Sequence, residues 1–368
     1  MASSLTILGG GNTAFAVAAN LALRGYAITI CEHPDFAHTL DPIRADQAIR
    51  LEGVAETGIA KIAHITTDPA EGLQNDLLLL IVPAYAHKPF AEFCAPYLRD
   101  GHMLVITPGT LGALAFAKVV REAGNQSTIA FAETDTAPYV CRKSAPDAAI
   151  IWGAVNGLGL GVFPATKTEA VADALADVFT IDGLSGSASA IAPYPNVVAC
   201  GLSAMNPVVH PAGVLMNAGR VEYARGEFYF YEEGVSPTVA NVIYAVDAER
   251  RAIGKALGFN LVAVDDAFHS AGFGPKGDLW ATINGSRMLT ALRAPGAIDT
   301  RWLTEDVPYG IAAWSLLGKQ LGVKALVMES LVGVASAALE RNFWASARTP
   351  AQLGLQGMDA AQINTSVA

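Results

Sequence analysis

Short, wholly apolar runs alternate with small-residue and amphipathic stretches along the first half of the chain. Runs that are apolar at every position are typical of parallel strands covered on both faces, and the stretches between them, such as Ala14–Arg24 and Leu111–Glu122, have helical periodicity. This alternation predicts a doubly wound α/β domain built on a parallel sheet. The predicted strands are Leu5–Leu8, Ala27–Cys31, Leu77–Val82, Met103–Thr107 and Thr128–Ala132.

The pattern changes near Ile181–Ile191, a segment of small residues rich in Gly and Ser. Such a composition favours a domain boundary, and beyond it strand signals are sparse while long helical patterns prevail. We therefore predict an α/β domain over residues 1–185 and a mainly α-helical domain over residues 190–368. The longest predicted helices are Val235–Leu257, Pro308–Leu321 and Ala325–Arg341.

Composition agrees with a compact α/β protein long enough for two domains. Of 368 residues, 52% are hydrophobic and 16% charged, and the net charge of −10 provides no basic surface for nucleic acid or an anionic membrane. The four cysteines are scattered, as in a reducing compartment, and the apolar run Asp76–Ala84 is far shorter than the ~20 residues of a membrane span. The chain enters a strand almost at once, without a signal-peptide pattern. We expect a cytoplasmic protein.

The first predicted strand leads directly into a glycine-rich loop that opens a helix. Gly9 permits a tight turn, Gly11 lets a pyrophosphate approach the backbone, and Ala14 lets the helix pack closely. The second strand ends at Glu32, where the dinucleotide-binding pattern requires an acid for the ribose hydroxyls. The order of these features predicts a Rossmann domain that binds NAD(H), with NADP(H) disfavoured by Glu32. The loop contacts are predicted to be Gly9, Gly10, Gly11, Asn12, Thr13 and Ala14.

Other residues follow predicted strands at the same edge of the sheet. Pro83 and Ala84 follow the third strand, and Pro108 and Gly109 the fourth. We expect them to line the nicotinamide side of the cofactor site, with plain turns as the alternative. Arg142 ends the segment after the fifth strand, where it could bind substrate or lie on the surface.

Two polar clusters stand out in the second half, Asn206–Arg220 and Thr300–Pro308. A histidine close to an apolar helix and a distant carboxylate are the usual components of an acid/base pair, although an isolated histidine is more often structural. Of Glu305 and Asp306 we expect only one to act, since neighbours in an extended segment face opposite ways. The aromatic run Tyr229–Tyr231 is compatible with a substrate wall or with core packing.

The chain resembles the octopine/nopaline (opine) dehydrogenase family along nearly its whole length. The resemblance is carried by the glycine loop, LLIVPAYAH, TPGTLGAL and AETDTAPYVCR, and most specifically by NPVVHPAGVLMNAGR and TRWLTEDVPYG. Enzymes of this family condense an L-amino acid with a 2-oxo acid, such as pyruvate or 2-oxoglutarate, using NADH or NADPH. The resemblance implies His210 and Asp306 as the catalytic pair and Arg301 as the substrate carboxylate ligand. We also expect Asn206 and Arg142 to bind substrate.

Two alternatives keep the fold. A ketopantoate-reductase-like dehydrogenase would reduce a 2-oxo acid directly and would use a lysine of the helical domain, but Lys255, Lys276, Lys319 and Lys324 lie outside the polar clusters. A non-catalytic NAD(H) sensor would not need His210, Arg301 and Asp306. We expect no metal, small-molecule partners only, and allow for a homodimer. The identity of both substrates and the stereochemistry of the product depend on the shape of the site, which no local motif encodes.

Overall fold

The computed structural model describes residues 4–181 and 191–368 and divides into two compact units, Met1–Gly201 and Leu202–Ala368. The predicted boundary between residues 185 and 190 falls within residues 182–190, outside the described part of the chain. The first unit extends to Gly201 because β12 (Ile191–Pro193) pairs with β11 (Leu158–Phe163), and α7 (Val197–Gly201) packs on β11 and β8.

The first unit contains an eight-stranded sheet in the order β12-β11-β8-β7-β6-β1-β2-β5. Strands β5, β2, β1, β6, β7 and β8 are parallel, and only β11 runs antiparallel to its neighbour β8. The chain reverses its direction of strand addition between β1 and β6, which is the topological switch point of a Rossmann sheet. The predicted doubly wound fold is confirmed. The remaining bounds are β1 Ser4–Leu8, β2 Ala27–Cys31, β5 His64–Thr66, β6 Leu77–Leu80, β7 Met103–Ile106 and β8 Ala130–Thr134.

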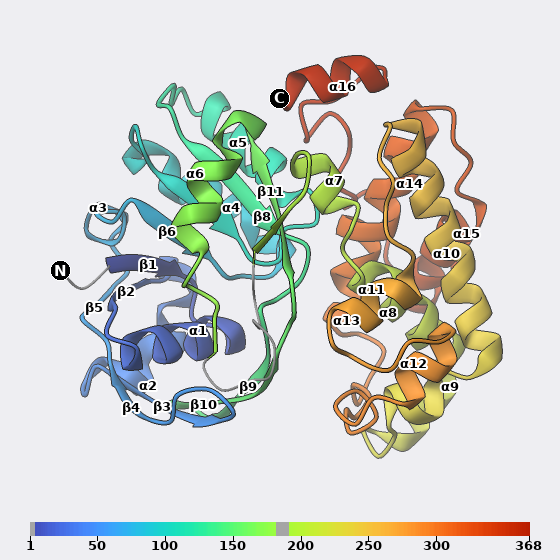
Figure 1. Ribbon diagram of the computed structural model, residues 1–368, viewed down its shortest axis with the longest axis horizontal. Helices are drawn as coiled ribbons and strands as arrows, with labels where there is room; N and C mark the ends of the chain where they lie inside the picture. Colours follow the sequence, from blue (N-terminus) through green and yellow to red (C-terminus); the bar gives the residue numbers. More distant parts are fainter. Residues whose placement is uncertain (1–3, 182–190) are drawn as a thin grey trace. The chain divides into compact units, whose positions relative to one another are not determined.

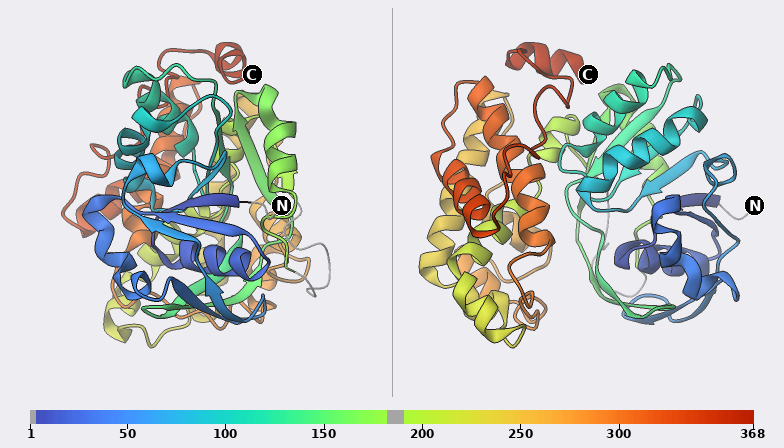
Figure 2. Two further views of the ribbon diagram at one scale, coloured as in Figure 1. Left: turned by 90° about the vertical axis from the view of Figure 1, so that its left-hand side faces the viewer. Right: turned by 180° about the vertical axis from the view of Figure 1, so that it is seen from behind.

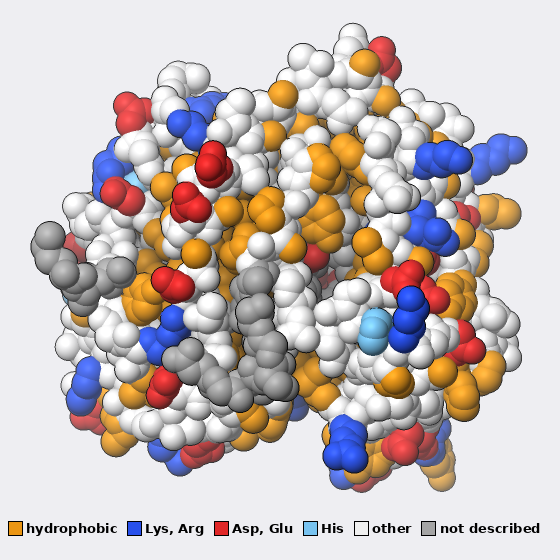
Figure 3. Space-filling view, in the orientation of Figure 1, with side chains coloured by type: hydrophobic (Ala, Val, Ile, Leu, Met, Phe, Trp, Pro, Cys, Tyr) orange, Lys and Arg blue, Asp and Glu red, His pale blue; other side chains and the backbone are white. Residues whose placement is uncertain are grey.

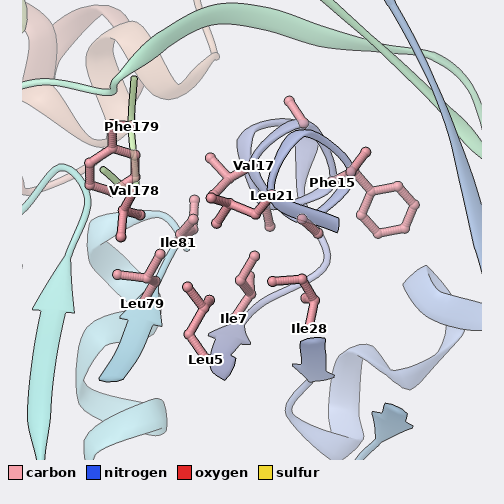
Figure 4. Packing of buried hydrophobic residues seen from close by; sticks show 14 of the residues in the cluster. Leu5, Ile7, Phe15, Val17, Leu21, Ile28, Leu79, Ile81, Val178 and Phe179 are labelled. Carbon is pink, nitrogen blue, oxygen red and sulfur yellow. The ribbon is translucent and has the colours of Figure 1, made fainter. Parts of the chain in front are cut away.

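Helices cover both faces of this sheet (Figure 1). On one face, Val17 and Leu21 of α1 (Asn12–Leu23) lie over the large sheet, as Figure 4 shows. The sheet residues beneath them are Ile7 of β1, Leu79 of β6 and Ile81, which follows β6. On the other face, α5 (Gly112–Glu122) packs on β7 and β8 and against α4 (His87–Cys94). The connecting helices are η1 Pro34–Leu40, α2 Asp41–Arg44, α3 Pro69–Gly72, η2 Ala84–Ala86, η3 Ala95–Tyr97, η4 Ala165–Lys167 and α6 Thr168–Leu175.

A second sheet, which the hydrophobic pattern did not predict, has the order β4-β3-β10-β9. Its strands are β3 (Ala48–Gly53), β4 (Gly58–Lys61), β9 (Tyr139–Ala145) and β10 (Ala148–Ala154). Helix α1 contacts all four of these strands as well as β1 and β2, so it is packed between the two sheets (Figures 1 and 2). This position explains why Ala14–Leu21 is buried throughout and apolar almost all round.

The second unit is helical, as predicted, and none of its residues lies in a named strand. Predicted helix Val235–Leu257 is α10 (Pro237–Ala256), and Ala325–Arg341 is α15 (Leu326–Ala338). Predicted helix Pro308–Leu321 consists of two parts, a π-helical segment η6 (Asp306–Ile311) and α14 (Ala312–Gln320). The other helices are α8 Asn206–Met216, α9 Ala218–Ala224, η5 Phe230–Gly234, α11 Val264–Ser270, α12 Leu279–Asn284, α13 Arg301–Thr304 and α16 Ala360–Ser366.

One segment of the described chain, Val197–Met216, is long and apolar enough to cross a membrane by length and composition. Within its most apolar window, 89% of the residues are buried inside the protein, as expected of core helices. On the face shown in Figure 3, acidic and basic side chains are interspersed among apolar and neutral ones.

Candidate active site

The glycine loop joins β1 to α1 at the switch point of the sheet. Gly9 has φ +118°, and a Cβ atom there would lie 2.7 Å from the Ile81 carbonyl oxygen, so the turn requires glycine. At Gly11, by contrast, a Cβ atom would meet nothing within 4 Å, and this residue begins α1 without a side-chain cap. The amides of the first turn thus have no side-chain cap, and they fit a dinucleotide pyrophosphate.

Glu32 follows β2 beside this loop but is only 4% exposed. Its Oε1 accepts a hydrogen bond from the His33 amide at 2.8 Å, and its Oε2 accepts one from the Thr39 hydroxyl at 3.2 Å. Burial raises the pKa of the Glu32 carboxyl, against the effect of the hydrogen bonds from His33, Thr39 and Gly10. The carboxylate thus fixes the loop. Its contact with the ribose, predicted from sequence, stays a prediction.

The other predicted cofactor residues lie just beyond the carboxyl ends of strands. Pro83 and Ala84 follow β6, which is the neighbour of β1, and Pro108 and Gly109 follow β7. The loop after β7 is held by Glu133, whose carboxylate accepts hydrogen bonds from the amides of Leu111 and Ala113 at 2.7 and 2.8 Å. These positions are where ligands of parallel sheets bind.

Asp135, immediately after β8, is a titratable group at this edge. Burial raises the pKa of its carboxyl to about 6. The carboxylate accepts hydrogen bonds from the Tyr194 hydroxyl at 3.0 Å and the Gly159 amide at 3.1 Å. These hydrogen bonds join the end of β8 to β11 and to the segment after β12. The role of Asp135 is therefore structural.

Arg142 lies on β9 of the small sheet, paired with Ile150 of β10, and its side chain is exposed. It is not part of the large sheet, because the segment after β8 continues into the second sheet. Its contact with substrate stays a prediction. Its neighbour Lys143 points the opposite way, toward α1, since alternate residues of a strand face opposite sides.

In the second unit, His210 and Asp306 lie together. The His210 Nδ1 atom is 2.8 Å from Asp306 Oδ2, and the two side chains are 10% and 13% exposed. The carboxylate accepts a hydrogen bond from Nδ1. This bond fixes the tautomer and leaves Nε2 as the atom able to exchange a proton with a ligand. The Tyr231 hydroxyl lies 3.3 Å from that Nε2 atom.

Aromatic side chains surround the imidazole of His210. The Trp302 ring is stacked on it, with centroids 4.2 Å apart and planes at 6°, and Phe230 contacts both rings edge-on. Burial raises the pKa of the Tyr231 phenol, and the Asp306 carboxylate adds to the effect, so its hydroxyl keeps its proton. The Tyr229–Tyr231 run therefore contributes Phe230 and Tyr231 to this cluster, while Tyr229 is 37% exposed.

Close packing between α8 and η6 brings the two residues within reach of each other. A Cβ atom at Gly310 would lie 2.4 Å from the Pro207 side chain, so only glycine allows this approach. The segment containing Glu305 and Asp306 is helical rather than extended, contrary to our expectation. The two carboxylates still diverge, since Glu305 pairs with Arg301 at 3.5 Å while Asp306 pairs with His210.

The two residues of this unit predicted to bind substrate lie close in the chain to His210 and Asp306. Asn206 begins α8, is exposed and lies one helical turn before His210. Arg301 begins α13, next to Trp302, and its side chain is 64% exposed. Both side chains are accessible to a ligand, and their substrate contacts stay predictions.

Sequence reasoning missed Trp302 and Lys143. Trp302 stands inside the TRWLTEDVPYG segment, so its place beside two predicted site residues was an available signal. Lys143 had no such signal, because its approach to α1 depends on the small sheet. Among residues 4–181 and 191–368, no group of three or more His, Cys, Asp or Glu side chains is placed to hold a metal ion.

Comparisons with known proteins agree with this arrangement. A sequence model of the family described as NAD/NADP octopine/nopaline dehydrogenase, alpha-helical domain, matches residues 193–339. The chain is 28% identical over 363 residues to an opine dehydrogenase of Arthrobacter sp. (strain 1C), covering 98% of each chain.

Among solved structures, octopine dehydrogenase in complex with NADH and agmatine superposes with a TM-score of 0.77 at 17% identity, covering 99% of this chain and 98% of the other. A PanE/ApbA family ketopantoate reductase from Ralstonia eutropha has a TM-score of 0.58 at 16% identity, covering 92% and 98%. The fold is therefore shared with both, and the agreement is greater with octopine dehydrogenase.

Proposed function

Because this chain belongs to the opine dehydrogenase family, whose members are NAD(P)-dependent oxidoreductases acting on the CH–NH group, we propose that it joins an L-amino acid to a 2-oxo acid. The 2-oxo acid is pyruvate, 2-oxoglutarate or a close analogue. The product is an N-(carboxyalkyl)amino acid, and the enzyme also catalyses the reverse oxidation.

The observation that carries this proposal is the buried pair of His210 and Asp306. Asp306 Oδ2 accepts a hydrogen bond from Nδ1 at 2.8 Å, so Nε2 is the ring nitrogen that can exchange a proton with a ligand. The Tyr231 hydroxyl, 3.3 Å from Nε2, donates to the neutral ring and accepts from the protonated one. It therefore supports both states of a group that gains and loses a proton.

In the condensation, the amino nitrogen adds to the keto carbon, and the resulting hydroxyl leaves as water with a proton from His210 Nε2. The imine that remains is reduced to a secondary amine. In the oxidative direction, Nε2 takes the proton of the amine. Asp306 keeps the ring oriented in both directions, and Trp302, stacked at 4.2 Å, restricts its rotation.

The glycine loop and the strand ends of the first unit fit NAD(H). The amides after Gly11 would bind the pyrophosphate, and the residues after β6 and β7 would line the nicotinamide. When bound, the nicotinamide supplies the hydride for reduction or accepts it in oxidation. We propose NADH as the preferred cofactor, since Glu32, directly after β2, would place a carboxylate near the ribose and repel a 2′-phosphate.

Arg301 is proposed to hold the carboxylate of the 2-oxo acid, with Asn206 and Arg142 as further substrate contacts. The planar guanidinium can donate two parallel hydrogen bonds to a carboxylate, a geometry that lysine lacks. Its exposed side chain pairs with Glu305 at 3.5 Å and can turn toward a ligand. The partners of the proposed enzyme are small molecules, and it acts in the cytoplasm. Sedimentation would test whether it forms a homodimer.

The experiment that tests the proposal follows NADH oxidation with pyruvate or 2-oxoglutarate, with and without each common L-amino acid. One amino acid is expected to raise the rate at least about tenfold over the 2-oxo acid alone, with the secondary amine identified by mass spectrometry. Rapid reduction of the 2-oxo acid without any amino acid would instead support a ketopantoate-reductase-like enzyme. Tight NADH binding without turnover of any pair would support a sensor.

A further inference from the structure

Two contacts join strand β9 to the first turn of α1. The Lys143 amide donates a hydrogen bond to Asn12 Oδ1 at 2.9 Å. Cys141, two residues earlier on the same face, has its Sγ atom 3.7 Å from Thr13 Oγ1. Asn12 and Thr13 belong to the glycine loop, so the side chain of Lys143 starts beside the proposed phosphate site.

The ammonium group of Lys143 lies over the ring of Phe15, with Nζ 3.4 Å from the ring centre. Phe15 is fully buried, and Figure 4 shows its ring pointing away from Val178 and Phe179. A cation over an aromatic face is attracted by the ring and is held in place. The charge is thus positioned next to the start of α1 rather than extended into solvent.

Within residues 4–181 and 191–368, no carboxylate forms an ion pair with this ammonium. Burial lowers the pKa of Lys143 to about 8, although the Glu32 carboxylate acts in the opposite direction. A partly desolvated cation without a paired anion is unfavourable unless a ligand supplies the negative charge. At the adjoining Gly11 a Cβ atom would meet nothing within 4 Å, so there is room for such a ligand.

We propose that Lys143 binds a phosphate group of the dinucleotide held at the glycine loop. The proposal rests on the proposed function for its ligand. Two phosphates have this chemistry, the pyrophosphate common to NADH and NADPH and the 2′-phosphate of NADPH alone. In the second case, Lys143 offsets the repulsion between Glu32 and the 2′-phosphate, and determines how strongly the enzyme prefers NADH.

The experiment measures dissociation constants of NADH, NADPH and adenosine by calorimetry for the wild type, Lys143→Met, Lys143→Arg and Lys61→Met. Lys61 is the matched control, because it is an exposed lysine of β4 in the same small sheet. Lys143→Met is expected to weaken dinucleotide binding about tenfold or more, the usual effect of losing a charge-assisted hydrogen bond. Lys143→Arg should retain most of the affinity, and adenosine binding should not change.

Each outcome decides between the alternatives. An equal loss of affinity for NADH and NADPH places the contact at the pyrophosphate, and a loss for NADPH alone places it at the 2′-phosphate. Unchanged affinity for both in Lys143→Met overturns the proposal. If the wild type binds neither dinucleotide, the proposed function fails instead.

A pH series provides a second measurement should Lys143→Met fold poorly. Since the cation is lost as pH rises through about 8, wild-type affinity should fall between pH 7 and 9.5, whereas Lys143→Arg should show no such fall. Helix α1 and β10, which pack on β9, contain no charged residue, and the Cys141 thiol has its pKa raised by burial to about 11. Among the described residues, Glu32 is the charged group that acts on the pKa of Lys143. A flat wild-type profile contradicts the proposal.

Discussion

His210 is held by side chains of three different chemical kinds. Asp306 fixes one ring nitrogen, Tyr231 lies at hydrogen-bond distance from the other, and Trp302 covers one face of the ring. A histidine in a plain core position needs hydrogen-bond partners for its two ring nitrogens, but no aromatic ring stacked on its face. The three together restrict position, tautomer and rotation, which is what proton transfer requires.

Removing the imidazole should affect turnover far more than cofactor binding. His210→Ala is expected to lower kcat by roughly 10²–10⁴-fold, the usual contribution of a positioned acid or base. Asp306→Asn should also lower kcat, because the charged ring loses its counter-charge. Steady-state kinetics with both substrates, together with NADH binding, would measure these effects.

His269→Ala is the control for this pair, since it removes an exposed histidine of the same unit. The double variant of His210 and Asp306 should be little worse than the worse single variant, because the two act as one unit. Near-wild-type kcat in His210→Ala would return His210 to a structural role. Additive losses would mean that the two residues act separately.

At the scale of elements, the pair depends on the contact between α8 and η6. His210 is on the first of these and Asp306 on the second, 96 positions later in the chain. Gly310 and Pro207 lie against each other at the contact, so the two elements approach more closely than ordinary side chains would allow. The spacing of His210 and Asp306 is therefore set by small residues that have no chemistry of their own.

Gly310→Ala tests this dependence, because the new Cβ atom would lie 2.4 Å from Pro207. Overpacking of this kind costs about 1–3 kcal/mol of unfolding free energy and should also lower kcat by moving Asp306 away from His210. Gly333→Ala in α15 is the matched control, since its Cβ atom would meet nothing within 4 Å. That change should be neutral or stabilise by about 0.5–1 kcal/mol.

Urea unfolding and steady-state kinetics of the two glycine variants give the comparison. If Gly310→Ala unfolds at the same urea concentration as the wild type, the close contact does not constrain the helices. If it is destabilised yet fully active, the contact is structural only and does not set the pair.

At the scale of the molecule, the proposed cofactor loop and the His210–Asp306 pair belong to different compact units. NADH at about 100 times its dissociation constant should stabilise the folded protein by about 2.7 kcal/mol, seen as a higher midpoint of thermal unfolding. His210→Ala should retain this increase, since its change lies outside residues 1–201. Lys143→Met should show a smaller increase at the same NADH concentration.

Scanning calorimetry with and without NADH would measure these midpoints. Pyruvate at the same concentration, without NADH, is the control and is expected to give a smaller increase. Loss of the NADH effect in His210→Ala would show that the second unit takes part in holding the cofactor, and the separate roles proposed here would then be wrong.

The local hydrophobic pattern was sufficient to predict the elements whose residues all lie in one kind of environment. Strands such as Leu77–Leu80 are buried on both faces, and a continuous apolar run is all that this environment demands. The small sheet was not predictable in this way. Its β3 and β10 pair Arg50 with Ala148, nearly a hundred residues apart, and the β3 sequence AIRLEG mixes charged and apolar residues.

The sequence by itself determined the strands and helices of the large sheet and the glycine loop, because short spacings and residue types express local backbone requirements. His210 and Asp306 were identified as candidates through the family resemblance of the segments that contain them. Tertiary structure alone decided that these two side chains meet at 2.8 Å, that Trp302 stacks on the imidazole, and that Arg142 lies in the small sheet. It also brought Lys143 to the glycine loop. Such contacts join residues distant in the chain, and their energies depend on packing that no local segment contains.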